Sequence, residues 1–134
     1  MSSESPAISH ITLGTNDPRR AARFYDATLR ILGFTCAAKV ADQPLMYCKG
    51  DQMPRIFVYY PFDDKPATAG NGSHVAFLAE TRTAVDDFYK AALANGGEDE
   101  GAPGIREEYM PNYYAAYVRD PDGNKLQAVC YSDS

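Results

Sequence analysis

The chain of 134 residues has two histidines, His10 and His74, and each opens a copy of the same pattern. A serine precedes each histidine, Phe-Tyr follows fourteen residues after it, and an offset of 64 residues also aligns Gly33 with Gly97. Self-similarity at a fixed offset indicates a duplicated module. Equivalent residues of two modules approach each other near a pseudo-twofold axis, and two imidazoles there are suitable ligands for Zn, Ni, Mn or Fe. The alternative is that each histidine is an ordinary residue at the edge of the core.

The segments around the two histidines alternate in polarity, as half-buried strands do. In residues 7–15 the alternation places His10 opposite the aliphatic face, and in residues 73–79 it does the same for His74. Each histidine is therefore predicted to face away from the main aliphatic face of its strand.

Each of these strands leads into a segment with apolar residues at helical spacing. Asp17 is a suitable N-cap for the first helix, and Pro18 fits the first helical position because its missing N–H needs no partner there. Gly33 is the expected end of this helix. In the second copy Thr81 is the expected cap, and the Asn-Gly-Gly run at 95–97 ends the helix.

Strand-like segments rich in β-branched and aromatic residues follow each helix. They span residues 34–41, 44–50 and 55–62 in the first copy, and 105–110, 113–120 and 125–131 in the second. The element order is βαβββ-βαβββ, which predicts an α+β fold. The modules are residues 8–62 and 72–131 of a single domain, 8–134, and residues 1–7 are expected to be a disordered lead-in.

Composition excludes several classes of partner. The net charge is −5 and no basic block occurs, so nucleic acid and anionic membranes are poor partners. No apolar run approaches the roughly 18 residues of a membrane span. Three cysteines make an odd count without a short metal-binding spacing, which favours reduced thiols and a cytoplasmic location.

The duplication, the histidine that opens each copy and the segment YYAAYVRDPDGNKLQAV (113–129) resemble the vicinal oxygen chelate superfamily over about residues 8–131. That superfamily includes glyoxalase I, extradiol dioxygenases, methylmalonyl-CoA epimerase, and fosfomycin- and bleomycin-resistance proteins. The nearest type is a small, single-domain glyoxalase-like protein. The resemblance implies two modules packed edge to edge as a cupped mixed sheet with helices outside, a divalent metal in the cup, and a homodimer.

Carried over residue by residue, the resemblance makes His10, His74 and Gln127 the metal ligands. Gln127 stands where the family usually has Glu, and no carboxylate occurs near Phe57 to Tyr59, where glyoxalase I has another. A set of neutral ligands leaves the metal charge uncompensated, so we expect weakened binding. The alternative role for Gln127 is a polar group that is hydrogen-bonded inside the cup.

Substrate-binding or catalytic candidates are the tyrosines predicted to line or flank the cup and the arginine that opens the first module's last strand: Tyr47, Tyr59, Tyr113, Tyr117 and Arg55. Tyrosine can donate to an oxyanion or stack on a ring, and arginine can pair with a carboxylate or phosphate. Ordinary packing of each tyrosine and solvation of the arginine are the alternatives.

Three functions follow from the resemblance. The first is a metal-dependent, glyoxalase-like lyase or isomerase acting on a small substrate that chelates the metal through adjacent oxygens. The second is a metal-independent protein that binds or sequesters a ligand, of the bleomycin-resistance type. The third is an extradiol-type dioxygenase, against which Gln127 argues because that chemistry uses two His and one carboxylate around Fe(II). Whether the chain is an enzyme stays open at this point, with the glyoxalase-like, metal-dependent lyase or isomerase favoured.

Overall fold

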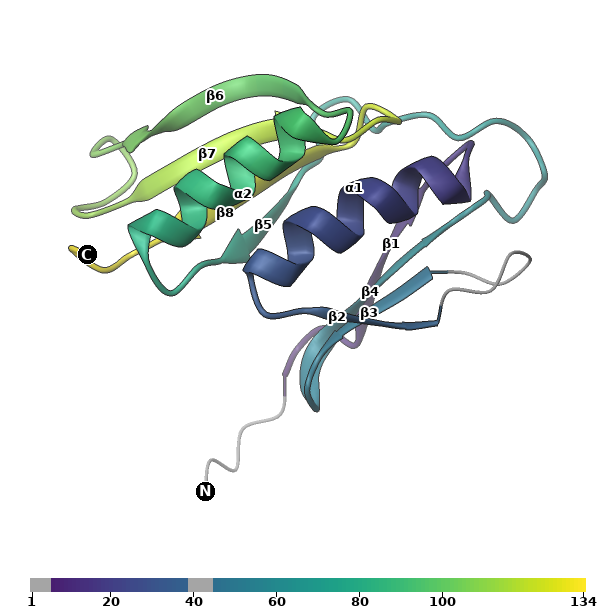
Figure 1. The fold of residues 1–134 in the computed structure, drawn as a ribbon, viewed down its shortest axis with the longest axis horizontal. Coiled ribbons are helices and arrows are strands. Elements are labelled where there is room, and N and C mark those ends of the chain that lie inside the picture. Colours follow the sequence, from purple (N-terminus) through teal and green to yellow (C-terminus); the bar gives the residue numbers. More distant parts are fainter. Residues whose placement is uncertain (1–5, 39–44) are drawn as a thin grey trace.

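The computed structural model describes residues 6–38 and 45–134, and within them each module has the predicted βαβββ order (Figure 1). The first module comprises β1 (His10–Gly14), α1 (Pro18–Ile31), β2 (Thr35–Ala38), β3 (Leu45–Lys49) and β4 (Gln52–Tyr59). The second comprises β5 (Val75–Leu78), α2 (Arg82–Ala94), β6 (Glu98–Ile105), β7 (Tyr114–Arg119) and β8 (Lys125–Cys130). The α+β class and the duplication are therefore confirmed. No helix among the described residues is long and apolar enough to cross a membrane.

Each module forms its own four-stranded mixed sheet, with strand orders β1-β4-β3-β2 and β5-β8-β7-β6. The first strand of each module pairs in parallel with the last, which sets His10 opposite Arg55 and Ala76 opposite Gln127. Because side chains opposite each other in register point to the same face, the first and last strands act together in placing polar groups.

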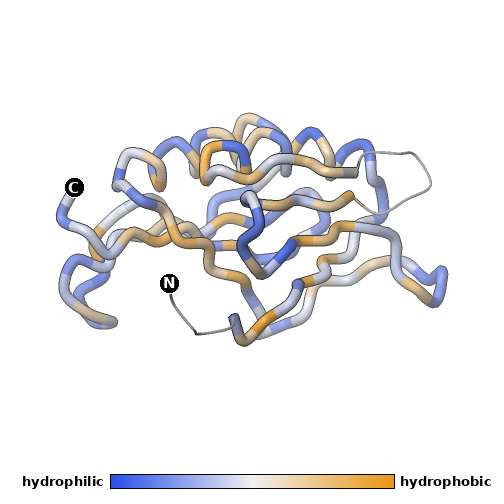
Figure 2. Tube along the Cα trace, turned by 90° about the horizontal axis from the view of Figure 1, so that it is seen from below, coloured by the Kyte–Doolittle hydropathy of each residue, from blue (hydrophilic) through white to orange (hydrophobic). Residues whose placement is uncertain are grey.

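The two helices lie in one layer over the two sheets (Figures 1 and 2). The edge strands β1 and β5 lie near each other, since Ile11 and Val75 line the same hollow, but no hydrogen-bonded ladder joins them. The strand faces turned away from the helices are here called the open face. Within the chain the modules therefore contact each other mainly through α1 and α2, while β1 and β5 make few contacts.

Capping side chains fix both helix starts as expected. Asp17 accepts a hydrogen bond from the Arg20 N–H, and Thr81 accepts one from the Ala84 N–H, which satisfies donors that a helix start leaves unpaired. Gly33, directly after the C-cap of α1, has a φ of 93°, a conformation that glycine adopts without steric cost.

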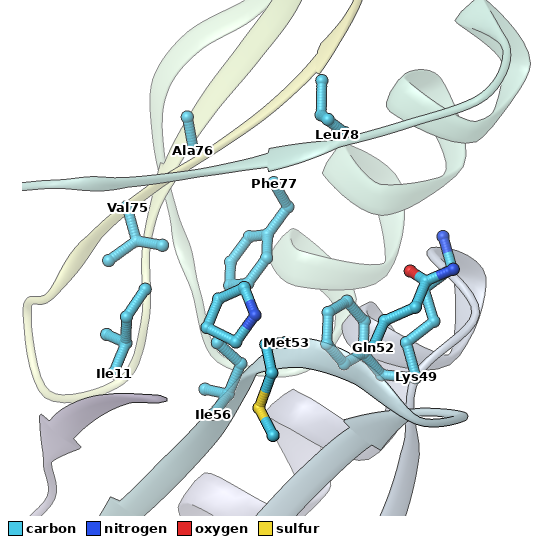
Figure 3. A pocket seen from close by; sticks show the side chains of 11 residues that line it. Ile11, Lys49, Gln52, Met53, Ile56, Val75, Ala76, Phe77 and Leu78 are labelled. Carbon is cyan, nitrogen blue, oxygen red and sulfur yellow. The ribbon is translucent and has the colours of Figure 1, made fainter. Parts of the chain in front are cut away.

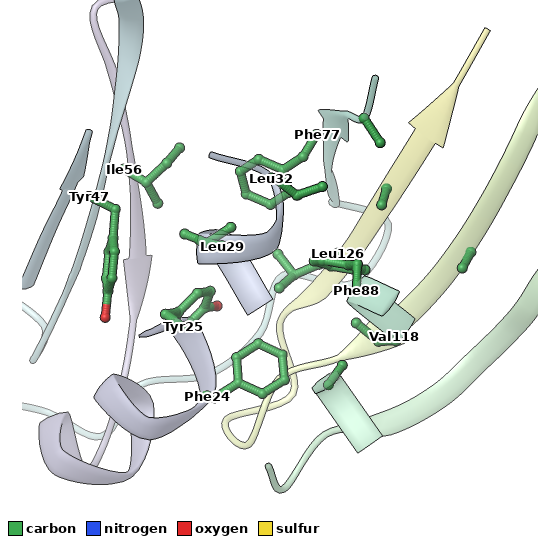
Figure 4. Packing of buried hydrophobic residues seen from close by; sticks show 14 of the residues in the cluster. Phe24, Tyr25, Leu29, Leu32, Tyr47, Ile56, Phe77, Phe88, Val118 and Leu126 are labelled. Atoms are coloured by element: carbon green, nitrogen blue, oxygen red, sulfur yellow. The ribbon is translucent and has the colours of Figure 1, made fainter. Parts of the chain in front are cut away.

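The core lies between the helices and the inner faces of both sheets (Figure 4). Each aromatic residue buried there contributes on the order of 1.5–3 kcal/mol of hydrophobic stabilisation relative to exposure. A single cluster joins the modules, and its large members include Phe24, Tyr25, Leu29, Ile56, Phe88, Val118 and Leu126.

The turn after β7 clamps the second module onto the first. Asp120 accepts from the backbone N–H groups of Asp122 and Asn124 and from the hydroxyl of Tyr25, so it closes the turn and reaches α1. Asp122 accepts from the Thr15 hydroxyl at 2.6 Å and from the Arg20 guanidinium at 2.7 Å. The predicted hairpin turn is thus also a joint between modules.

One strand prediction was wrong. The strand expected at 105–110 lies instead at Glu98–Ile105, and the chain turns after Arg106, whose carbonyl accepts from the Tyr109 N–H. β6 is an edge strand that pairs only with β7, so it tolerates a proline and an irregular register around Gly101. In this segment the content of apolar and aromatic residues therefore did not predict the position of the strand. Residues 1–5 of the predicted lead-in and 39–44 of the first module lie outside the described residues.

Candidate functional site

A chain of polar contacts on the open face of the second module begins at His74, which lies directly before β5. Its Nε2 is 3.1 Å from Oε1 of Gln127, which β8 holds at 1% exposure. The Gln127 amide nitrogen donates in turn to the hydroxyl oxygen of Tyr113. Because an amide oxygen only accepts, this arrangement places a proton on His74 Nε2. The chain brings together three of the residues predicted from the sequence.

Tyr117 lies at the centre of a cationic and aromatic cluster on the same face. Its ring is 6.0 Å from the His74 ring between centroids, and its centroid is 5.3 Å from both Arg106 Cζ and Lys125 Nζ. Desolvation, followed by the nearby Tyr113 and Tyr109, raises the pKa of Tyr117 to about 12. Tyr117 therefore keeps its proton at neutral pH, and its hydroxyl is hydrogen-bonded with that of Tyr113.

The two cations in this cluster were absent from the sequence-based candidates. Arg106 is held by donation to the carbonyls of Ala102, Gly104 and Ala115, so its charge is fixed beside Tyr117. Arg106 was missed because residues 105–110 were predicted to form a strand. Lys125 is the first residue of β8 and lines one cavity with His74, and Arg55 of β4 lies opposite His10 in register. This equivalence was the signal that could have identified Lys125.

The corresponding face of the first module is more apolar. The His10 ring meets Phe57 edge-on at 5.3 Å, and His10 Nδ1 is 3.0 Å from the hydroxyl of Ser9. Arg55 lies opposite His10 in register, and its buried Nε has no hydrogen-bond partner among the described residues. Tyr59 lies further along β4, with its ring 6.5 Å from Phe57. Phe57 thus occupies the position where the second module has Gln127.

Tyr47 does not join the other candidates. It is 1% exposed and belongs to the core, and its hydroxyl donates to Asp26 of α1 at 2.8 Å. Burial and this hydrogen bond raise the pKa of Tyr47 well above its ordinary value. The alternation of β3 accounts for this, because the neighbours of Tyr47 point to the open face while Tyr47 points to the helices.

Two cavities lie where β1 approaches β5. One, of about 200 Å³, has a lining whose polar residues are Thr12, Ser73, His74, Asn124 and Lys125; we call it the junction cavity. The other, of about 240 Å³, is largely apolar: in Figure 3 Ile11, Ile56, Val75 and Phe77 converge on it from both modules. Polar chemistry is therefore concentrated in the junction cavity and on the face beside it.

The donor set fits a firmly held divalent metal poorly. No group of three or more His, Cys, Asp or Glu side chains that could hold a metal occurs in the part of the chain that the structure describes. The four strands nearest the junction, β1, β4, β5 and β8, contain no Asp or Glu but supply Arg55 and Lys125. His10, His74 and Gln127 are neutral donors, so a 2+ charge would be uncompensated.

Comparison with known proteins places this chain in a family. The profile of the Glyoxalase/Bleomycin resistance protein/Dioxygenase superfamily matches residues 7–128. The chain belongs to this superfamily, whose members share the fold described above. The superfamily commonly binds divalent metals and small molecules. No curated protein matches the chain.

Solved structures agree. A glyoxalase/bleomycin resistance protein from Albidiferax ferrireducens T118 is 36% identical, with a TM-score of 0.80 over 93% of this chain and 98% of that one. A glyoxalase-related enzyme from Fulvimarina pelagi is 21% identical, with a TM-score of 0.71 over 94% and 88%. A lactoylglutathione lyase from Agrobacterium tumefaciens is 22% identical, with a TM-score of 0.64 over 95% and 96%. The last two show the fold alone.

Proposed function

We propose that the chain binds a small, oxygen-bearing molecule on its open face and that it does so without a resident metal, as a ligand-binding protein of the bleomycin-resistance type. The observation that carries this proposal is the charge of the strands around the junction: Arg55 and Lys125 are present and acidic residues are absent. Such a surface repels a divalent cation and attracts electron-rich oxygens.

The polar chain supplies the contacts that orient such a ligand. His74 and Gln127 already hold each other at 3.1 Å, and Tyr113 holds the other end of the amide, so these groups lose little freedom when a ligand arrives. Tyr117 presents an aromatic ring beside them. An apolar wall with a few fixed polar groups is the usual composition of a small-molecule site.

A metal-dependent, glyoxalase-like lyase or isomerase is the second candidate, and the convergence of His74 and Gln127 on one point favours it. His10, His74 and Gln127 would hold the Zn, Ni, Mn or Fe ion, which when bound would polarise two adjacent substrate oxygens. The extradiol dioxygenase has no comparable support, because the strands nearest the junction supply no carboxylate.

Nuclear magnetic resonance of the two imidazoles distinguishes the candidates, since a chain with two histidines gives two ring-signal sets that His10→Ala assigns. Protein freed of metal by a chelator is screened against oxygen-bearing fragments, with and without added Zn²⁺. We expect fragments that shift the His74 signals in the presence of chelator, and weaker binding in Tyr113→Phe. Binding only after Zn²⁺ addition would establish the second candidate instead, and no shift at either histidine under any condition would overturn both.

We also propose a homodimer, as the resemblance implies. Apolar side chains that are well exposed support it: Leu78 is 64% exposed and Phe62 is 100% exposed. Large apolar surface of this kind is commonly covered by a partner. Sedimentation equilibrium at micromolar concentration should give twice the 14.7 kDa chain mass, and a single-chain mass would contradict the proposal.

A further inference from the structure

We infer that the junction cavity is a site for a small oxyanion, a carboxylate or phosphate group, with Lys125 as its charged partner. This inference rests on the proposed function and adds the charge of the ligand to it. The cavity lies between the two modules, and its polar lining consists of an ammonium, an imidazole, two hydroxyls and an amide, from Lys125, His74, Thr12, Ser73 and Asn124. The ammonium and the hydroxyls can donate hydrogen bonds to an anion, and no carboxylate is among the lining residues.

Lys125 is the only charged residue that lines the cavity, although the whole chain carries −5. Lys125 Nζ and Arg106 Cζ are each 5.3 Å from the Tyr117 centroid, so two cations flank one ring. Among the ion pairs found in the described residues, none involves Lys125, Arg106 or Arg55. Two neighbouring cations without a carboxylate repel each other, and an anion between or beside them relieves this repulsion.

Lys125 is the group best placed to meet the anion. Arg106 is already bound to three backbone carbonyls, whereas Lys125 has only the Tyr117 ring as a recorded partner in the described chain. The ammonium can therefore turn into the cavity at little cost. A volume of about 200 Å³ is below the roughly 300–1,000 Å³ of pockets for drug-sized ligands, which restricts the ligand to a small molecule or a single anionic group.

The two modules differ at equivalent positions, and only the second has the polar groups that an anion needs. Arg55 is the equivalent cation of the first module, but His10 beside it faces Phe57, an apolar ring, and not an amide. Gln127 and Tyr113 supply further polar contacts only in the second module. We therefore expect the anionic group of the ligand to bind at Lys125 and the remainder of the ligand to extend toward Arg55 and Phe57.

Benzoate and benzamide test the inference, because they have nearly the same shape and differ in charge. Inorganic phosphate serves as a second oxyanion. Dissociation constants are measured from the His74 ring signals of metal-free protein. We expect benzoate or phosphate to bind at least about tenfold more tightly than benzamide, consistent with a charge-assisted hydrogen bond. Binding of the anion should weaken between 0.15 and 1 M NaCl, while benzamide should be unaffected.

Three variants locate the effect. Lys125→Met keeps the length of the side chain and should remove the preference for the anion, Lys125→Arg should retain it, and Lys90→Met on the exposed face of α2 should leave it unchanged. Equal affinity for benzoate, phosphate and benzamide would overturn the inference while the ligand-binding function stands. A preference for the anion that survives in Lys125→Met would also overturn it. Failure of every ligand to shift His74 would instead overturn the proposed function itself.

Discussion

Replacing Gln127 by glutamate should turn a poor metal site into a better one. The wild-type amide oxygen lies 3.1 Å from His74 Nε2, so a carboxylate at this position would share a metal ion with that imidazole. We expect the Gln127→Glu variant to bind Zn²⁺ roughly 100-fold more tightly than the wild type. The reason is that the three metal ligands, all neutral in the wild type, then include one negatively charged carboxylate.

The magnitude follows from two opposing contributions. Unit charges about 4 Å apart at an effective dielectric constant of about 20 attract by about 4 kcal/mol, and the 2+ charge of zinc doubles this. Burial at a position that is 1% exposed favours the protonated carboxyl, and releasing that proton to bind zinc costs several kcal/mol. A net gain of about 3 kcal/mol corresponds to the roughly 100-fold change in affinity.

Isothermal titration of chelator-treated protein with ZnCl₂ measures the effect. Gln52→Glu is the matched control, because it adds the same charge at an exposed position at the start of β4. Its zinc affinity should stay within about threefold of the wild type. Equal affinities for wild type and Gln127→Glu would refute the reasoning, and so would stoichiometric, tight zinc binding by the wild type, because the neutral donor set would then suffice.

Three further predictions concern the tyrosines and the joint between modules. Tyr25→Phe removes the hydroxyl that donates to Asp120 in a fully buried contact, and should lower the free energy of unfolding in urea by about 1–3 kcal/mol; a loss under about 0.5 kcal/mol would contradict this. Burial raises the pKa of Asp120 above its usual 3.8, so the folded protein holds this proton more tightly than the unfolded chain does. Its contribution to stability is therefore present below about 3.8 and declines as pH rises through the raised value, and this decline should be missing from Asp120→Asn in a series of urea titrations across pH. Tyr117, with a pKa of about 12, should stay protonated at pH 10.5; the ultraviolet absorbance change of tyrosine ionisation up to that pH should be the same in Tyr117→Phe as in the wild type.

Local signals in the sequence were sufficient where a short stretch of chain determines the structure. The helix caps at Asp17 and Thr81 depend on residues three positions away, and the alternation in β1 determines which face His10 occupies. These features could be predicted because the physical interactions that fix them are close in sequence.

The parts that escaped prediction depend on partners distant in sequence. Tyr47 has the residue type of a site tyrosine, but its contact with Asp26 of α1 places it in the core. Arg106 became visible only when the course of β6 was known, because backbone carbonyls on two strands hold it. No single segment contains the information that Arg106 and Lys125 flank the same ring.

The absence of a hydrogen-bonded ladder between the described strands β1 and β5 has a consequence for how this protein can evolve. Each sheet keeps its own register, so a change of register in one half does not require a change of pairing in the other. One copy can then lose its polar groups while the other retains them. Phe57 in the first half and Gln127 in the second occupy equivalent register positions and differ in this way. Duplication has given this chain two equivalent surfaces. The one around Phe57 is apolar, and the one around Gln127 is polar and carries cations.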